Sequence, residues 1–199
     1  LDARVVLYDK DTKEEELPKL AIRPYPIQYV GTWTAKDKTK VTVRPILPED
    51  EALLVNFHHI LSDRTVFMRY LQPMMLQERV MHERLARICH VHSDREIALV
   101  AETIDSKREQ NIMGVVRLSR IHGTNKARLS VLVGDPYQGV GLGGELVRRA
   151  VDVARQEKMS GLSAVLTTDN QMMLHIFGKC GFRIEPVNTD RLVAAVIDL

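Results

Sequence analysis

The sequence of 199 residues has few of the features that mark secreted, membrane or nucleic-acid-binding proteins. Cys89 and Cys180 are its two cysteines, too few for a disulfide framework. No run approaches the roughly 18 apolar residues that would cross a bilayer. The 28 Lys and Arg residues nearly balance 26 Asp and Glu, and the two signs are interspersed, which argues against nucleic acid. Because 45% of the residues are hydrophobic, we expect a folded protein. The low cysteine count and the lack of a long apolar run predict a reducing, cytoplasmic setting without a membrane partner.

Several common catalytic signatures are missing as well. There is no G-K-[ST] phosphate loop and no G-x-S-x-G nucleophile elbow. His82-Glu83 would begin a zinc-protease helix only if residue 86 were His, and it is Ala86. Cys89 and His90 stand near a further His but lack a clear fourth ligand at a usual zinc spacing. We therefore expect no metal site.

The pattern of apolar residues predicts the element order ββααβββαβαββ. Strands are expected over 28–34, 40–45, 96–103, 112–121, 127–133, 162–167, 182–185 and 191–197, and helices from residue 48, over 62–89 with a break near Pro73, over 141–157 and over 171–179. Short links predict antiparallel hairpins, whereas the helix over 141–157 makes 162–167 parallel to 127–133. The prediction is an α+β fold: a mixed, mostly antiparallel sheet with one parallel βαβ crossover, flanked by helices.

The most informative stretch runs from Val131 to Gly144 and reads as a strand, a turn and a helix start. Four glycines fall within six positions: Gly139, Gly141, Gly143 and Gly144. Glycines let several backbone N–H groups converge at a helix N-terminus without obstruction by Cβ atoms, which favours binding of a diphosphate. A turn without a ligand is the plain alternative, but it has no need of the conformational entropy that four glycines cost.

A dinucleotide site is a second alternative. Gly139, Gly141 and Gly144 fit the spacing G-x-G-x-x-G, and Asp169 lies beyond the next strand, where a ribose-binding acid can sit. Against it, Pro136 and Gln138 separate the strand from the first glycine, and only about 55 residues follow, too few for a doubly wound sheet.

Gln138, Gly141 and Gly143 also fit Q-x-x-G-x-G, and here the sequence resembles the GNAT superfamily of N-acyltransferases. The resemblance implies that this loop holds the diphosphate of acetyl-CoA, the expected cosubstrate, and that the pantetheine arm lies where the two parallel strands part. The cofactor-binding residues it implies are Leu132, Val133, Gln138, Gly139, Val140, Gly141, Leu142, Gly143, Gly144 and Asn170. Asn170, at the start of a second family signature, is equally well explained as a plain helix N-cap.

Further segments, among them 40–46, 61–70 and 94–101, are similar to the GNAT domain attached to NDP-forming acyl-CoA synthetases, the branch that includes bacterial protein lysine acetyltransferases. The resemblance implies that residues 1–26 are the tail of a preceding ATP-grasp-like domain plus a linker, and that residues 27–199 form the acyltransferase domain. It also implies a protein substrate, with an acyl-CoA synthetase, fused or separate, as one such partner.

The usual proton-transfer residues of the family are absent. The position of the usual Glu is Arg128, and that of the usual Tyr is Phe177. If the hairpins turn near residues 107–108 and near 124, Arg120 lies opposite both Arg128 and Glu96. Glu96 is then a candidate general base acting through a water, held by Ser130, although an ion pair with Arg120 or Arg128 is the simpler role for it.

Three functions follow from this pattern. The first is acetyl transfer to protein lysine. The second is an acetyl-CoA-binding regulatory domain that senses the thioester for an attached synthetase and catalyses little, as the absence of both proton-transfer residues would allow. The third is acylation of a small amine.

Overall fold

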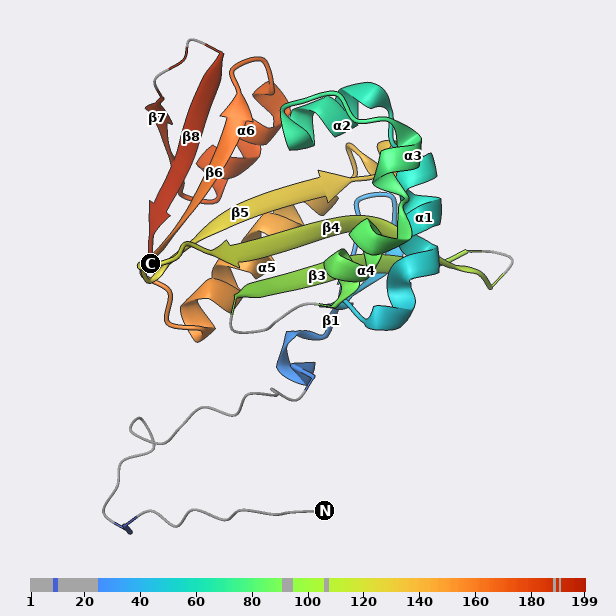
Figure 1. Cartoon of the computed structure of the whole chain (residues 1–199), viewed down its shortest axis with the longest axis horizontal. Helices are drawn as coiled ribbons and strands as arrows, with labels where there is room; N and C mark the ends of the chain where they lie inside the picture. Colours follow the sequence, from blue (N-terminus) through green and yellow to red (C-terminus); the bar gives the residue numbers. More distant parts are fainter. Residues whose placement is uncertain (1–8, 11–24, 91–94, 106–107, 188, 190) are drawn as a thin grey trace.

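The computed structural model describes residues 9–10, 25–90, 95–105, 108–187, 189 and 191–199, which build an eight-stranded sheet with helices on both faces (Figure 1). The strands are β1 (Gly31–Thr34), β2 (Lys40–Pro45), β3 (Glu96–Ile104), β4 (Gln110–Arg120), β5 (Lys126–Val133), β6 (Gly161–Thr167), β7 (Arg183–Pro186) and β8 (Leu192–Asp198). The helices are α1 (Glu51–His59), α2 (Asp63–Tyr70), α3 (Leu76–Arg79), α4 (His82–Cys89), α5 (Leu142–Gln156) and α6 (Gln171–Lys179).

The strands follow the order β1-β2-β3-β4-β5-β6-β8-β7 across the sheet. All neighbouring strands run antiparallel except β5 and β6, which are parallel and joined by α5. This is the predicted α+β arrangement with a single crossover.

Helices α5 and α6 cover one face of the sheet. The apolar residues of α5 recur at helical spacing, and Leu142, Leu146, Ala150 and Val153 are all buried on the sheet side. They pack with apolar residues of β3, β4 and β5 and with Phe177 of α6 in the larger core.

Helices α1 to α4 lie on the opposite face (Figure 1). Leu54 and Phe57 of α1 and Leu85 of α4 pack against Val100 and Ile112 of the sheet in a second core. Helix α2 lies farther along the sheet, where it contacts both β5 and β6. No helix in the described part of the chain combines the length and the apolar character needed to traverse a bilayer.

The helical stretch predicted over 62–89 is divided into three helices. Helix α2 ends because Leu71 adopts a left-handed conformation with φ 58°, and Pro73 follows, so a new helix begins only at Leu76. The prediction for residues 1–26 concerns a segment of which 1–8 and 11–24 lie outside the described residues, so the domain boundary stays a prediction.

Candidate active site

The parallel strands β5 and β6 pair only at their beginnings. Their register joins Lys126 to Gly161, Ala127 to Leu162 and Arg128 to Ser163, and no later pair exists although β5 continues to Val133 and β6 to Thr167. The strands therefore part into a wedge that opens toward their carboxyl ends. Backbone groups of β5 that face this wedge are not used by β6, so they are available to an extended ligand with amide groups.

The glycine-rich loop stands at the open end of the wedge. Gly139 and Gly141 have φ of +80° and +95°, values that favour glycine, and Gly141 is the N-cap of α5. Within the described residues, the backbone N–H groups from Gly139 to Gly144 donate to no acceptor. A row of unused donors at the N-terminus of a 15-residue helix is suited to a diphosphate.

Asp135 anchors this loop to helix α2. Its carboxylate accepts hydrogen bonds from the Ser62 backbone N–H at 2.9 Å, from Ser62 Oγ at 2.7 Å and from Thr65 Oγ1 at 2.9 Å. Burial by itself raises the pKa of Asp135, but these hydrogen bonds outweigh it, so the pKa lies below its usual value. Sequence reasoning missed this anchor, because only the N-cap pattern of Ser62 and Thr65 is visible locally.

The side chain of Gln138 also holds the loop in place. Its side-chain Nε2 donates to the Val133 carbonyl oxygen and to Thr65 Oγ1, both at 3.2 Å. The Val140 carbonyl oxygen in turn accepts from the Lys36 backbone N–H at 3.1 Å, which ties the loop to the β1–β2 turn. Both the side chain of Gln138 and its backbone N–H, which donates to the Asp135 carbonyl oxygen at 3.3 Å, thus shape the loop.

The other residues named from the sequence are placed around the same wedge. Leu132 and Val133 form the end of β5, which pairs with β4 but not with β6, while Leu142, Gly143 and Gly144 form the first turn of α5. Asn170 caps α6, since its Oδ1 accepts from the Met173 backbone N–H at 3.3 Å. The cap that sequence analysis offered as one explanation of Asn170 is present, and a contact with the cosubstrate stays a prediction.

The predicted neighbours of Glu96 are wrong by one residue. Ser119, not Arg120, stands opposite both Glu96 and Arg128. The error lies in the turn positions. Next to the turns Ile104 pairs with Gln110 and Arg120 with Ala127, so both hairpins turn slightly earlier than the predicted pairs require, and the β-bulge between Ala101 and Glu102 moves the β3–β4 register back by one residue. Since a shift of one residue changes the face, Arg120 points to the other side of the sheet and pairs at 2.9 Å with Glu157, the C-cap residue of α5.

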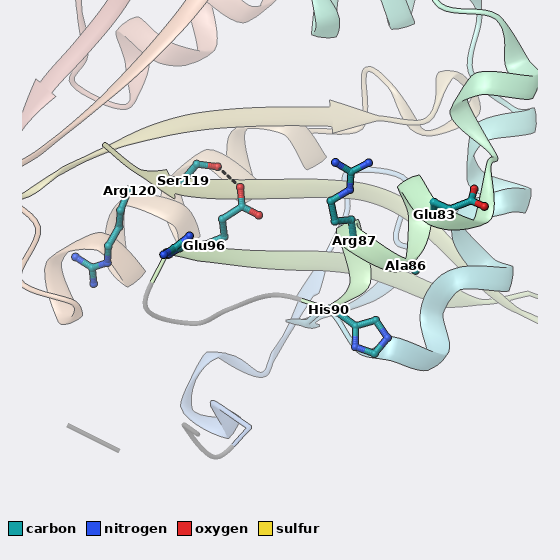
Figure 2. Close-up of a pocket in the computed structure, with 8 residues that line it drawn as sticks. Glu83, Ala86, Arg87, His90, Glu96, Ser119 and Arg120 are labelled. Carbon is teal, nitrogen blue, oxygen red and sulfur yellow. Dashed lines mark hydrogen bonds between the residues drawn. The ribbon is translucent and has the colours of Figure 1, made fainter. Parts of the chain in front are cut away.

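Glu96 is engaged in an ion pair, as expected, but with a different arginine. Its Oε2 accepts from Arg117 Nη1 at 2.6 Å. Its Oε1 accepts from Ser119 Oγ at 2.8 Å (Figure 2). Glu96 and Ser119 line a pocket of about 560 Å³ under α4. The pocket is lined by Glu83, Ala86, Arg87, His90, Arg95, Glu96, Ser119 and Arg120. Glu96 thus has access to solvent, although both its oxygens already have partners.

Ser130 and Phe177 have structural contacts of their own. Ser130 shares its sheet face with Arg128, as predicted, and its Oγ accepts from Arg69 Nη2 of α2 at 2.8 Å. Phe177 is buried and meets Phe182 edge to face at 4.8 Å between ring centroids. Phe177, which the resemblance places where the family usually has Tyr, is therefore a core residue.

Comparison with known proteins agrees with this geometry. The family model described as acetyltransferase (GNAT) domain matches residues 40–183. Acetyltransferase PA5475 of Pseudomonas aeruginosa is 27% identical over 146 residues, which cover 73% of this chain and 76% of that protein. The chain therefore belongs to the GNAT family, and it is an acetyltransferase of that family.

Solved structures share the fold over most of the chain. The GNAT domain of S. lividans PAT matches with a TM-score of 0.79 and 26% identity, covering 88% of this chain and all (100%) of that one. RimJ of Mycobacterium smegmatis, in complex with CoA-disulfide, matches with a TM-score of 0.66 and 17% identity over 85% of this chain and 86% of that one. Spermidine N-acetyltransferase from Vibrio cholerae, in complex with CoA and spermine, has a TM-score of 0.60 and 20% identity over 79% and 95%.

Proposed function

We propose that this chain transfers the acetyl group of acetyl-CoA to lysine side chains of proteins. The observation that carries the proposal is the wedge between β5 and β6 with a row of unused amides at its mouth. The amides from Gly139 to Gly144 would hold the diphosphate, and the free edge of β5 would hold the pantetheine arm. The resemblance of the sequence to the lysine-acetylating branch, together with the similarity to S. lividans PAT, supports protein lysine as the acceptor.

The reaction needs a neutral amine. Its nitrogen attacks the thioester carbonyl carbon, the C–S bond breaks, and the proton lost by the amine ends on the departing sulfur. At pH 7 only about one lysine amine in 2,500 is neutral. Arg128 lies near the closed end of the wedge, on the face of the sheet that α2 covers. Its positive charge disfavours the ammonium form of a lysine that approaches there and thereby favours the neutral, reactive amine.

Positioning supplies most of the catalysis in this proposal. The wedge fixes the thioester, and backbone N–H groups of β5 that polarise its carbonyl act without a titrating residue. Glu96 remains a candidate general base. To act as one it has to leave Arg117 or Ser119, because each of its oxygens already accepts a hydrogen bond.

A regulatory domain is the second candidate. Arg128 and Phe177 favour it, because neither of the family's usual proton-transfer residues is present. Such a domain would bind acetyl-CoA and change the activity of an attached acyl-CoA synthetase. We place that synthetase, fused through residues 1–26 or separate, as a partner in both proposals.

Mass spectrometry with isotopically labelled acetyl-CoA separates the two functions. The chain is incubated with the thioester and with an acyl-CoA synthetase or lysine-containing peptides, and labelled acetyl groups on lysine are counted. We expect labelling that depends on the chain. Tight acetyl-CoA binding in calorimetry without any labelled lysine would overturn acetyl transfer and favour the regulatory domain. Glu96→Gln tests the base, since unchanged turnover would exclude it.

A further inference from the structure

A cluster of arginines lies between α2, α4 and the sheet, next to the wedge. The cluster consists of Arg69 of α2, which donates to the hydroxyl of Ser130, Arg84 of α4, and Arg117 of β4, which stands opposite Ser130 in the β4–β5 ladder. Arg69 and Arg84 lie over the Tyr70 ring, with Cζ at 4.9 and 5.0 Å from its centroid. We call these three arginines the arginine cluster.

The arginine cluster has too few negative charges around it. Arg117 pairs with Glu96, but in the described part of the chain no carboxylate lies within ion-pair distance of Arg69 or Arg84. Arg84 Nε is buried without a hydrogen-bond partner among the described residues. A desolvated guanidinium without a counter-ion is costly, and nearby like charges increase that cost. An anion bound between these arginines would remove that cost.

The electrostatic surroundings of Arg69 point the same way. Burial lowers its pKa; Tyr70 partly offsets this, and the charges of Arg117 and Arg84 lower the pKa further. Arg69 nevertheless keeps donors for a ligand. Nη2 is occupied by Ser130 Oγ at 2.8 Å, while Nε and Nη1 have no acceptor within the described residues. Such a fork suits a carboxylate.

The position of the cluster relates it to the acyl acceptor. The β5–β6 ladder ends at Arg128, and Ser130 is the next residue of β5 on the face that α2 covers. Helix α2 also reaches β6, where Met68 Sδ accepts from Thr167 Oγ1 at 3.1 Å. Arg69 thus sits at the closed end of the wedge, on the face opposite α5 and α6. An amine that approaches from this face carries its neighbouring groups past the cluster.

We propose that the arginine cluster binds a carboxylate of the acyl acceptor, so that the domain prefers a lysine with an acidic neighbour in the protein chain. The inference rests on the proposed acetyl transfer to protein lysine, because it assigns the acceptor to this face. The same carboxylate chemistry is offered by the α-carboxylate of a free amino acid, and the experiment separates these two sources.

The test measures binding, so that it does not depend on acetyl transfer. Affinities of the full chain, with CoA present, are determined by calorimetry or anisotropy for two peptides, Asp-Lys-Asp and Asn-Lys-Asn with blocked ends, and for lysine against lysinamide. We expect the acidic peptide to bind about tenfold more tightly, as for a charge-assisted hydrogen-bonded pair. Added salt should reduce the difference.

Variants assign the preference to the cluster. Arg69→Gln should abolish it, and Arg69→Lys, which keeps the charge but not the fork, should keep part of it. The matched control is Arg64→Gln, which removes the same charge from an exposed position of α2 and should leave the preference unchanged. Thermal melts of each variant exclude loss of folding.

Each outcome decides between the possibilities. A preference for the acidic peptide that disappears in Arg69→Gln supports the proposal. A preference for lysine over lysinamide, with equal peptide affinities, keeps the carboxylate site and rejects the protein source. If the two peptides bind equally and lysine binds like lysinamide, or if the preference survives Arg69→Gln, the arginine cluster is not a carboxylate site. Peptide preference without any acetylated product would instead contradict the proposed acetyl transfer and leave the carboxylate site standing.

Discussion

Arg128 of β5 and Ser163 of β6 form the last pair of the only parallel ladder among the described strands. Beyond this pair the two strands run apart, and the glycine-rich loop begins where β5 ends. The position of one pair therefore sets how deep a thioester can enter the sheet. Because a sheet that parts in this way exposes backbone donors and acceptors, it binds extended amide chains through the main chain.

The loop amides can be tested without disturbing the fold. Gly144 lies in the first turn of α5, and a Cβ atom there would meet nothing within 4 Å. In Gly144→Glu, a carboxylate near the helix N-terminus is favourable for the helix but repels a diphosphate. We expect the dissociation constant for CoA, measured by calorimetry, to rise at least about tenfold, with no loss of thermal stability.

The control for this prediction is Gly144→Gln, which has the same length and no charge. Its CoA affinity should remain close to that of the unmodified chain, since the open space around residue 144 accepts the side chain. If the Glu variant bound CoA as tightly as the Gln variant, the diphosphate would not lie at this helix terminus.

The order of elements and the glycine-rich loop could be predicted because their signals are local. Helical spacing marks α5, alternation marks the strands, and the glycines from Gly139 to Gly144 mark a loop whose backbone N–H groups can converge at a helix start. The partners of Glu96 could not be predicted in the same way. Their register depends on where each hairpin turns and on a bulge at Ala101 and Glu102, and an error of one residue is enough to place Arg120 on the wrong face.

Contacts between distant segments were also beyond the sequence. Asp135 meets Ser62 across 73 residues, and Arg69 meets Ser130 across 61. Each depends on where α2 packs relative to β5, which is decided by the shapes of many side chains together. The residues that fix the loop and those of the arginine cluster therefore appeared only with the structure.

His58 predicts how stability depends on pH. It is buried in α1, and its Nδ1 has no partner among the described residues. Burial lowers its pKa to about 4, and the charges of Arg84 and Arg79 contribute. Between pH 6.5 and 4 the unfolded chain thus binds a proton that the folded chain does not. The free energy of unfolding should fall as the pH decreases through this range, by about 3 kcal/mol.

Chemical denaturation at a series of pH values checks this prediction. In His58→Gln the stability should depend less on pH between 6.5 and 4, whereas His59→Gln, at the exposed neighbouring histidine, should keep the full dependence. A difference between the unmodified chain and His58→Gln that stays constant over this range would show that His58 is not the titrating group.

The identity of residue 128 predicts a gain of activity. The resemblance to the lysine-acetylating branch places a Glu at this position, where β5 and β6 part, and Arg128 is exposed without an ion pair in the described part of the chain. Arg128→Glu should therefore be tolerated by the fold and supply a general base beside the amine. General bases contribute about a hundredfold or more to the reaction rate. We expect Arg128→Glu to acetylate a lysine peptide at least about tenfold faster than the unmodified chain. The rate is measured by chromatography of the CoA that the reaction releases. Arg128→Gln removes the positive charge without adding a base and should lower the rate, because that charge favours the neutral amine. An equal acceleration in both variants would assign the effect to the loss of the positive charge and contradict the role given to Arg128. If neither variant changed the rate, the amine would not reach the closed end of the wedge, since a base there can act only on a group within hydrogen-bond reach or one water away.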